Sequence, residues 1–254
     1  MQALNVPVEN MLTNARRNLA RDLPMFVPGR KSEEVCIVGG GPSLSATLPN
    51  LRMRYNRGAT IWALNGAMDW LQEHHLTPDA MVLLDARPEM VGMLRNLHKK
   101  TIYYVAAQCD PAVFDALSGY EVRMWVGYCP GIEAVASEFP QKPIVIVGGG
   151  NTVGLKALCM ASLCQFQRIH LFGFDSCYGE SHHAYPQPLN DGEKTMGFKA
   201  AGRSFTAAGW MARQAQDFVI DYRNATAAGA KVTVHGDGLI PHIAKQLSKE
   251  PTHV

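Results

Sequence analysis

The sequence predicts an α/β protein: a mostly parallel, Rossmann-like sheet with helices on both faces and a polar lid after a late strand. From residue 34 onward, short continuous apolar runs alternate with helical patterns. Such runs are typical of parallel strands that are buried on both faces. A second observation is a repeated heptapeptide, because residues 37–43 read IVGGGPS and residues 146–152 read IVGGGNT. Each copy has the order of a buried strand, a tight turn and the start of a helix.

The composition is that of a folded globular protein. The chain has 254 residues, of which 47% are hydrophobic and 18% are charged. Its formal net charge of +2 is too small to indicate a nucleic acid or an anionic membrane as a partner. Six cysteines without C-x-x-C spacing indicate reduced core residues of a cytoplasmic protein. The sequence contains no 18-residue apolar stretch and no leader pattern, so we expect neither secretion nor a membrane span.

The elements are predicted in the following order. Residues 1–30 form an N-terminal arm with a helix at about 8–20, and residues 31–254 form the main domain. Predicted strands lie at 35–39, 60–64, 80–85, 101–107, 121–126, 144–147, 168–173 and 231–234. Predicted helices lie at about 44–56, 66–75, 88–97, 111–117, 131–138, 152–164 and 208–228. The polar segment 174–207 is longer than ordinary loops, and we interpret it as an ordered lid.

The first glycine-rich turn is a candidate phosphate site. A helix N-terminus has unpaired N–H groups and a partial positive charge, so it stabilises anions. The residues predicted to contact the nucleotide here are Gly39, Gly40, Gly41, Pro42 and Ser43. Leu44 stands where a dinucleotide fingerprint needs its last glycine, and no Gly-Lys-Ser/Thr follows, so the turn is neither that fingerprint nor a P-loop. A tight turn without a ligand is the alternative.

The second turn is expected to face the same ligand. Its predicted contacts are Gly149, Gly150, Asn151 and Thr152, of which the last two are also candidate helix caps. Gly154 would allow close approach of a ligand. Lys156 is expected to face solvent. Together the two turns predict a shared cradle for negative oxygens.

Polar residues follow two further strands. Asn65 comes after the run at 60–64, where it could bond a base or ribose, or serve only as an Asn-Gly turn. Asp85 follows another apolar run, and a carboxylate there suits Mg²⁺ bound to donor phosphates. The alternatives for Asp85 are a surface pair with Arg87 and a helix cap ahead of Pro88.

The densest cluster of reactive side chains lies at the start of the lid. Asp175 follows a strand, and Tyr178, His182, His183 and Tyr185 come next. Imidazoles suit a general base, and phenols can stabilise a phosphate leaving group. The histidines lack the spacing of a zinc site. A solvated polar loop is the structural alternative.

Two more sets of residues are candidates for the rim of the same site, at the carboxyl ends of the strands. Arg203 and Arg213 flank the end of the lid and could close onto phosphate. Residues 235–238, with the sequence HGDG, follow the last strand and would line the rim or form a turn.

These motifs resemble the family named for the archaeal 6-hydroxymethylpterin diphosphokinase (MptE-like). The resemblance covers roughly residues 33–180. The blocks that carry it are 38–44, Asn65, 78–85, 149–154 and 170–175. The first and last blocks also resemble those of bacterial sialyltransferases and flagellin-modifying glycosyltransferases. The resemblance implies a Rossmann-like fold and transfer from a nucleotide donor to a small-molecule acceptor.

In the diphosphokinase interpretation, the group moved is pyrophosphate, from ATP to a small alcohol. The resemblance then implies donor phosphate contacts at Gly41 and Ser43, a nucleotide contact at Asn65, and Mg²⁺ at Asp85 and Asp175. This interpretation is our first hypothesis.

The runner-up is a metal-independent glycosyltransferase with a nucleotide-sugar donor. The resemblance then implies His182 or His183 as the acceptor's base, and Tyr178 or Tyr185 as the partner of the departing phosphate. A third hypothesis is a non-catalytic module that binds a nucleotide. The sequence leaves the oligomeric state open, a homo-oligomer included.

Overall fold

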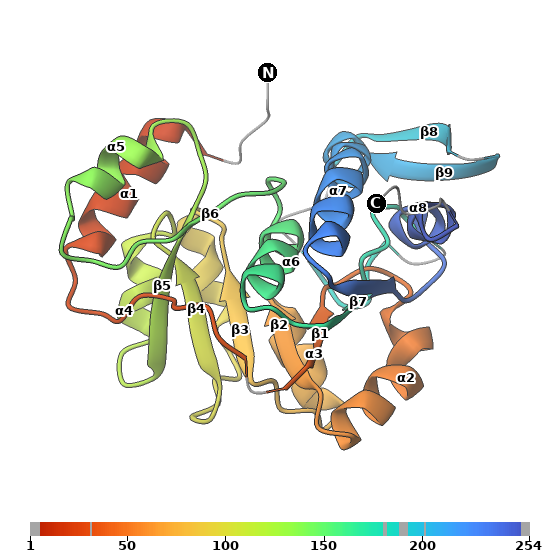
Figure 1. Ribbon diagram of the computed structural model, residues 1–254, viewed down its shortest axis with the longest axis horizontal. Helices are drawn as coiled ribbons and strands as arrows, with labels where there is room; N and C mark the ends of the chain where they lie inside the picture. The colour runs from red at the N-terminus through yellow and green to blue at the C-terminus, as the bar shows by residue number, and fades with distance from the viewer. Residues whose placement is uncertain (1–5, 31, 180–181, 188–192, 201, 250–254) are drawn as a thin grey trace.

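The protein has one large parallel sheet, shown in the computed structural model of Figure 1. The structure describes residues 6–30, 32–179, 182–187, 193–200 and 202–249. Eight strands form the sheet in the order β10-β7-β1-β2-β3-β4-β5-β6, and every pairing within it is parallel. Helices α6 and α7 pack side by side across it, while α2 contacts β7 and α3 contacts β2 (Figure 1). The predicted fold class is therefore confirmed.

All eight predicted strands are present, with ends within two residues of those expected. They are β1 (Glu34–Val38), β2 (Thr60–Leu64), β3 (Ala80–Leu83), β4 (Ile102–Ala106), β5 (Glu121–Gly127), β6 (Ile146–Val147), β7 (Arg168–Phe172) and β10 (Lys231–Val234). Most of their residues are buried, as expected for strands covered on both faces.

The helices follow the predicted order with two differences. They are α1 (Val8–Leu19), α2 (Leu44–Asn56), α3 (Ala67–Glu73), the 3₁₀ helix η1 (Pro88–Met93), α4 (Pro111–Ala116), α5 (Ile132–Ser137), α6 (Val153–Leu163), α7 (Gly209–Ala227) and α8 (Leu239–Leu247). The α-helix expected at 88–97 is only η1. Helix α8 was missed because Pro241 interrupts its pattern, although proline is tolerated in a first helical turn. Within the described residues, no helix is both long and apolar enough to span a bilayer.

The segment predicted as a lid contains an antiparallel hairpin. Its strands are β8 (Thr195–Ala200) and β9 (Arg203–Ala208), which lie beside α7 and α8 at the upper right of Figure 1. Most residues of β8 are exposed, so this strand lacks the continuous apolar run that identified the others.

The strand order reverses between β1 and β7. The chain runs from β1 to β6 in one direction along the sheet, then returns to place β7 and β10 on the other side of β1. Open α/β sheets bind ligands at such a reversal, beyond the carboxyl ends of the strands. There the Gly39 N–H donates to the Phe172 carbonyl at 2.8 Å and the Gly41 N–H to the Gly173 carbonyl at 2.9 Å.

A buried side-chain amide connects the N-terminal arm to the sheet by hydrogen bonds. Helix α1 packs on α4 and α5. Asn18 of this helix is fully buried, and its Nδ2 donates to the carbonyls of Ala107 at 2.9 Å and Cys109 at 2.8 Å. A buried carbonyl that loses its donor retains the full cost of its desolvation.

We therefore expect Asn18→Leu to lower the free energy of unfolding by roughly 1–3 kcal/mol, because two carbonyls lose their donor. Urea unfolding followed by circular dichroism measures this difference. The matched control is Asn10→Leu, at an exposed position of the same helix, for which little change is expected. Equal losses in the two variants would contradict the assignment.

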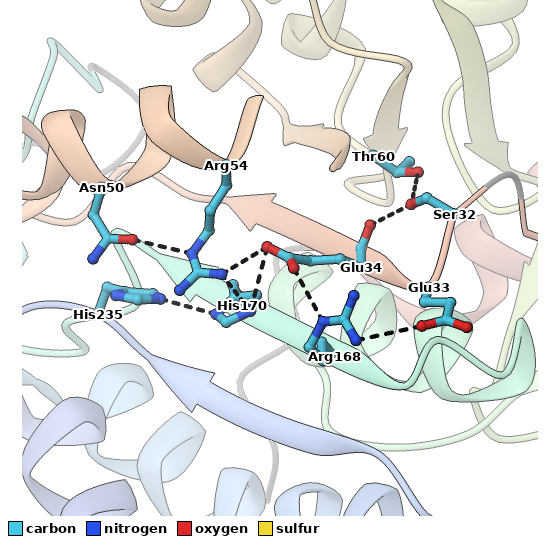
Figure 2. Close-up of polar contacts among 9 residues, drawn as sticks. All are labelled: Ser32, Glu33, Glu34, Asn50, Arg54, Thr60, Arg168, His170 and His235. Atoms are coloured by element: carbon cyan, nitrogen blue, oxygen red, sulfur yellow. Dashed lines mark hydrogen bonds and ion pairs between the residues drawn. The ribbon is translucent and has the colours of Figure 1, made fainter. Parts of the chain in front are cut away.

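A network of charged and imidazole side chains joins β1, β7 and the loop after β10 to helix α2 (Figure 2). Arg54 Nη1 contacts Glu34 Oε1 at 2.6 Å and His170 Nε2 at 2.9 Å. His170 Nδ1 lies 3.0 Å from His235 Nε2. Because a guanidinium can only donate, His170 must accept at Nε2, carry its proton on Nδ1 and donate to His235. Arg54 thus determines the tautomers of both imidazoles.

Both imidazoles resist protonation. Burial, with Arg54 nearby, lowers the pKa of His170 and of His235 from 6.5 to about 4. Between these pH values the folded state binds fewer protons than the unfolded state, so this contribution to stability is lost as the pH falls.

We expect the free energy of unfolding to fall more steeply between pH 6.5 and 4 in the wild type than in the double variant His170→Gln/His235→Gln. The measurement is urea unfolding across this range. The difference between the two proteins is the readout, because Asp175 and Asp221, whose pKa values are raised, act in the opposite direction in both. The control is His182→Gln, which removes an exposed imidazole. If the free energy of unfolding changed with pH equally in the wild type and the double variant, the prediction would be contradicted.

Candidate active site

A cavity of about 760 Å³ lies between the first glycine-rich turn, the end of β7, the hairpin and the loop after β10. Residues that the sequence predicted for the site line it: Pro42, Ser43, Asp175 and Tyr178, together with Arg203, Asp237 and Gly238 from the rim candidates. Its volume is in the range of small-molecule sites, and it lies at the strand-order reversal between β1 and β7.

Asp175 is the central polar group of the cavity. Its side chain is almost fully buried, and its Oδ2 accepts a hydrogen bond of 3.0 Å from the Ser43 N–H. Burial raises the pKa of Asp175, although hydrogen bonds from Ser43 and Gly238 act against this shift. The carboxylate stands at the N-terminus of α2, where the sequence predicted the oxygen of a ligand. This turn therefore does stabilise a negative oxygen.

Two buried side-chain oxygens have no hydrogen bond of acceptable geometry to any described residue: Ser43 Oγ in the first turn and Asn65 Oδ1 after β2. Ser43 Oγ lies beside the Asp175 carboxylate and against Gly236. Asn65 has a φ of 47°, in the left-handed region that asparagine tolerates, and it directly follows β2 as predicted. Unpartnered buried oxygens are costly, and they are typical of positions that receive a ligand or water.

The lid covers the turn on its β2 side. The Ala184 N–H donates to the Gly40 carbonyl at 3.0 Å, and the Tyr185 ring lies against Gly40 and Gly66. A Cβ at Gly40 would lie 2.7 Å from the Tyr185 hydroxyl. Burial raises the pKa of Tyr185 well above its usual value of 10, so this phenol stays protonated at neutral pH.

Both predicted histidines contact Tyr178. Its ring lies 4.5 Å from His182 and 6.0 Å from His183, centroid to centroid. The Tyr178 hydroxyl donates to Glu193 at 3.2 Å, and the pKa of Tyr178 is raised by partial burial and by this carboxylate. His182 is exposed and His183 is half-buried, while Asp175 lies inside the cavity.

The second turn does not contribute to this cavity. The Gly150 N–H donates to Asp221 Oδ2 at 2.9 Å, and Thr152 caps α6 by accepting from the Leu155 N–H at 3.4 Å, as its sequence position predicted. Asn151 is exposed.

The predicted shared cradle is therefore wrong in this conformation. Asp175 occupies the first turn and Asp221 the second. The Phe174 ring lies between the two turns, because a Cβ at Gly39 would be 3.6 Å from it and a Cβ at Gly154 only 2.7 Å. Gly154 thus makes room for Phe174 and not for a ligand.

Lys156 is a second correction. The sequence predicted a solvent-facing side chain, but Lys156 is buried, and burial lowers its pKa. Its Nζ donates to the carbonyls of Val147, Gly148 and Gly149 at 3.0–3.3 Å. Val147 ends the two-residue edge strand β6, and Gly148 and Gly149 follow it, so the ammonium supplies donors that a longer ladder would have provided.

The predicted pair of magnesium ligands does not form. Asp85 follows β3 and Asp175 follows β7, and β1 and β2 separate these strands, a spacing of about 14 Å for three strand steps. One Mg²⁺ at ordinary ligand distances cannot bridge them. Asp85 pairs with Arg87, at 2.5 Å between Oδ2 and Nη2, as the alternative held, although both side chains are half-buried and not on the open surface. The described residues contain no cluster of three or more potential metal ligands.

The hairpin adds cavity residues that the sequence did not identify, including Lys199 and Thr206. They were missed because β8 and β9 were not predicted. Arg203 and residues 237–238 do line the rim as expected, whereas Arg213 pairs with Asp217 along α7. Cys177 also lines the cavity, but burial raises its pKa, which argues against a nucleophilic thiolate.

Comparison with known proteins agrees with this fold. A solved structure, the MAf glycosyltransferase from Magnetospirillum magneticum AMB-1, superposes with a TM-score of 0.68 at 19% identity. The match covers 93% of this chain but 38% of that one, so the present chain corresponds to a part of the larger protein. No curated protein matches the sequence significantly.

The family model described as 6-hydroxymethylpterin diphosphokinase MptE-like matches residues 9–181, about two thirds of the chain. The description of this family names a transferase, which agrees with the enzyme class expected from the sequence and leaves the transferred group open. The chain belongs to the 6-hydroxymethylpterin diphosphokinase MptE-like family.

Proposed function

We propose that this protein transfers a glycosyl group from a nucleotide-sugar donor to the hydroxyl group of a small acceptor. The observation that carries the proposal is the buried carboxylate of Asp175, which faces a cavity of about 760 Å³ beside an α-helix N-terminus. The fold shared with a glycosyltransferase supports the same reaction class.

Asp175 is the proposed general base. It takes the proton of the acceptor hydroxyl as the oxygen attacks the anomeric carbon, and the bond between that carbon and the donor phosphate breaks. A carboxylate whose pKa is raised by burial is a better base near neutral pH than an ordinary one. The Ser43 N–H holds the carboxylate in a fixed position and stabilises its ionised form.

The departing phosphate is proposed to lie on the Asn65 side of the first turn, beside Tyr185. Two observations support this position: the buried unpartnered Asn65 oxygen and the Tyr185 ring, which lies against Gly40 and Gly66. The Tyr185 and Gln187 side chains fill the space over Gly40 in the present conformation, so they move when the donor binds. The protonated Tyr185 phenol can donate a hydrogen bond to the phosphate as the electron pair moves onto it. The nucleotide-sugar donor would thus lie across the first glycine-rich turn.

A second candidate is pyrophosphoryl transfer from ATP, which the description of the matching family model favours. The same base and hydroxyl acceptor would serve, with attack on phosphorus instead of carbon. The residues present do not fit the expected pair of magnesium ligands, since Asp85 and Asp175 belong to separated strands. We therefore place glycosyl transfer first.

A nucleotide panel separates the hypotheses. We expect the thermal midpoint to rise with a cytidine or uridine nucleotide or nucleotide sugar, without Mg²⁺, and mass spectrometry to detect slow release of the sugar. Stabilisation only by ATP with Mg²⁺, with AMP as a product, would favour the diphosphokinase instead. Tight binding without turnover of any donor would indicate a binding module.

Asp175→Asn tests the base. We expect kcat to fall about 10²–10⁴-fold with little change in donor affinity. At pH 7 the thermal midpoint should rise, because a raised folded pKa means that the ionised carboxylate destabilises the fold above pH 3.8. The control is Asp115→Asn, at an exposed carboxylate on α4. Wild-type turnover of Asp175→Asn would contradict the proposal, and His182→Ala and His183→Ala would then test the imidazoles.

A further inference from the structure

Arg203 and Asp237 form an ion pair at the rim of the cavity. Arg203 Nη1 lies 2.7 Å from Asp237 Oδ1, and Nη2 lies 3.0 Å from Oδ2. The contact is bidentate and joins the start of β9 to the loop after β10. Both residues line the cavity, yet their side chains remain 42% and 74% exposed.

Arg203 can exchange Asp237 for another anion at little cost in free energy. Exposed ion pairs contribute little to stability, because water solvates both charges when they separate. Arg203 lowers the pKa of Asp237, which is therefore ionised at neutral pH and presents two negative oxygens to the guanidinium. The planar fork of an arginine fits a carboxylate or a phosphate in the same bidentate way.

Arg203 shares one face of the hairpin with Phe205, and its guanidinium carbon lies 5.1 Å from the centroid of the Phe205 ring. Lys199, Ser204 and Thr206 also line the cavity, but they alternate with these residues along β8 and β9. Arg203 is therefore the hairpin cation that faces Asp237 at the rim, and Asp237 neutralises it in the present conformation.

We infer that Asp237 is an internal substitute for a substrate anion, and that Arg203 exchanges it for phosphate or carboxylate oxygens when the substrate enters the cavity. The anion site stands on the geometry of the rim, and only the identity of its ligand rests on the proposed function. Two sources share this chemistry: the phosphates of the nucleotide donor and an anionic group on the acceptor.

Isothermal titration with inorganic pyrophosphate tests the site directly. We expect Arg203→Gln to bind pyrophosphate about tenfold more weakly, because a charge-assisted bidentate contact is lost. Arg203→Lys should be intermediate, since it keeps the charge without the fork. Asp237→Asn should bind about two- to fivefold more tightly, because the internal competitor is removed.

The matched control is Arg213→Gln, which removes an exposed arginine from an ion pair outside the cavity. Circular dichroism checks that each variant is folded. Equal pyrophosphate affinity in the wild type, Arg203→Gln and Asp237→Asn would overturn the inference, as would no measurable binding by the wild type.

Two further measurements on Arg203→Gln identify which substrate supplies the anion. Weaker binding of nucleoside mono- and diphosphates by Arg203→Gln assigns the site to the donor. Unchanged nucleotide binding with a raised acceptor KM assigns it to the acceptor. Failure of the proposed function would look different, because no donor would then support transfer while pyrophosphate affinity still responded to Arg203→Gln.

Discussion

The close approach of two glycine backbones is the constraint on which the candidate site depends. Where the strand order reverses, the turn after β1 and the end of β7 hydrogen-bond to each other. A Cβ at Gly39 would lie 2.9 Å from the Gly173 carbonyl oxygen, and one at Gly173 would lie 2.7 Å from the Gly39 oxygen. Gly173 also has a φ of 65°, which disfavours side chains. This contact brings the first turn next to the end of β7, where the Ser43 N–H donates to Asp175.

The glycine-rich turns hold the chain's own side chains. Asp175 fills the first turn, Asp221 the second, and Tyr185 lies over Gly40. The electrostatics expected of a helix N-terminus are present, because a carboxylate occupies that position in the first turn. What differs is the source of the anion, which is the protein itself. At the rim, Asp237 has the same relation to Arg203.

The same four elements carry both the site and the charged network of Figure 2. Strands β1 and β7, the segment after β10 and helix α2 meet at Asp175 on one side and at His170 on the other. His235 stacks on Phe172, with ring centroids 4.1 Å apart, and precedes the glycine that packs on Ser43. The network therefore links, by hydrogen bonds and ion pairs, the segments from which the cavity is built.

The sequence by itself determined the eight strands, their order along the chain and the turns that follow them. Buried parallel strands need continuous apolar runs, which are local and can be read without a structure. The hairpin lacks such runs, and it supplies Lys199 and Arg203 to the cavity. Only the tertiary structure decided which polar groups meet. Asp85 and Asp175 both follow strands, yet β1 and β2 lie between those strands. Strand order depends on crossover connections between distant segments, and no local pattern encodes that order.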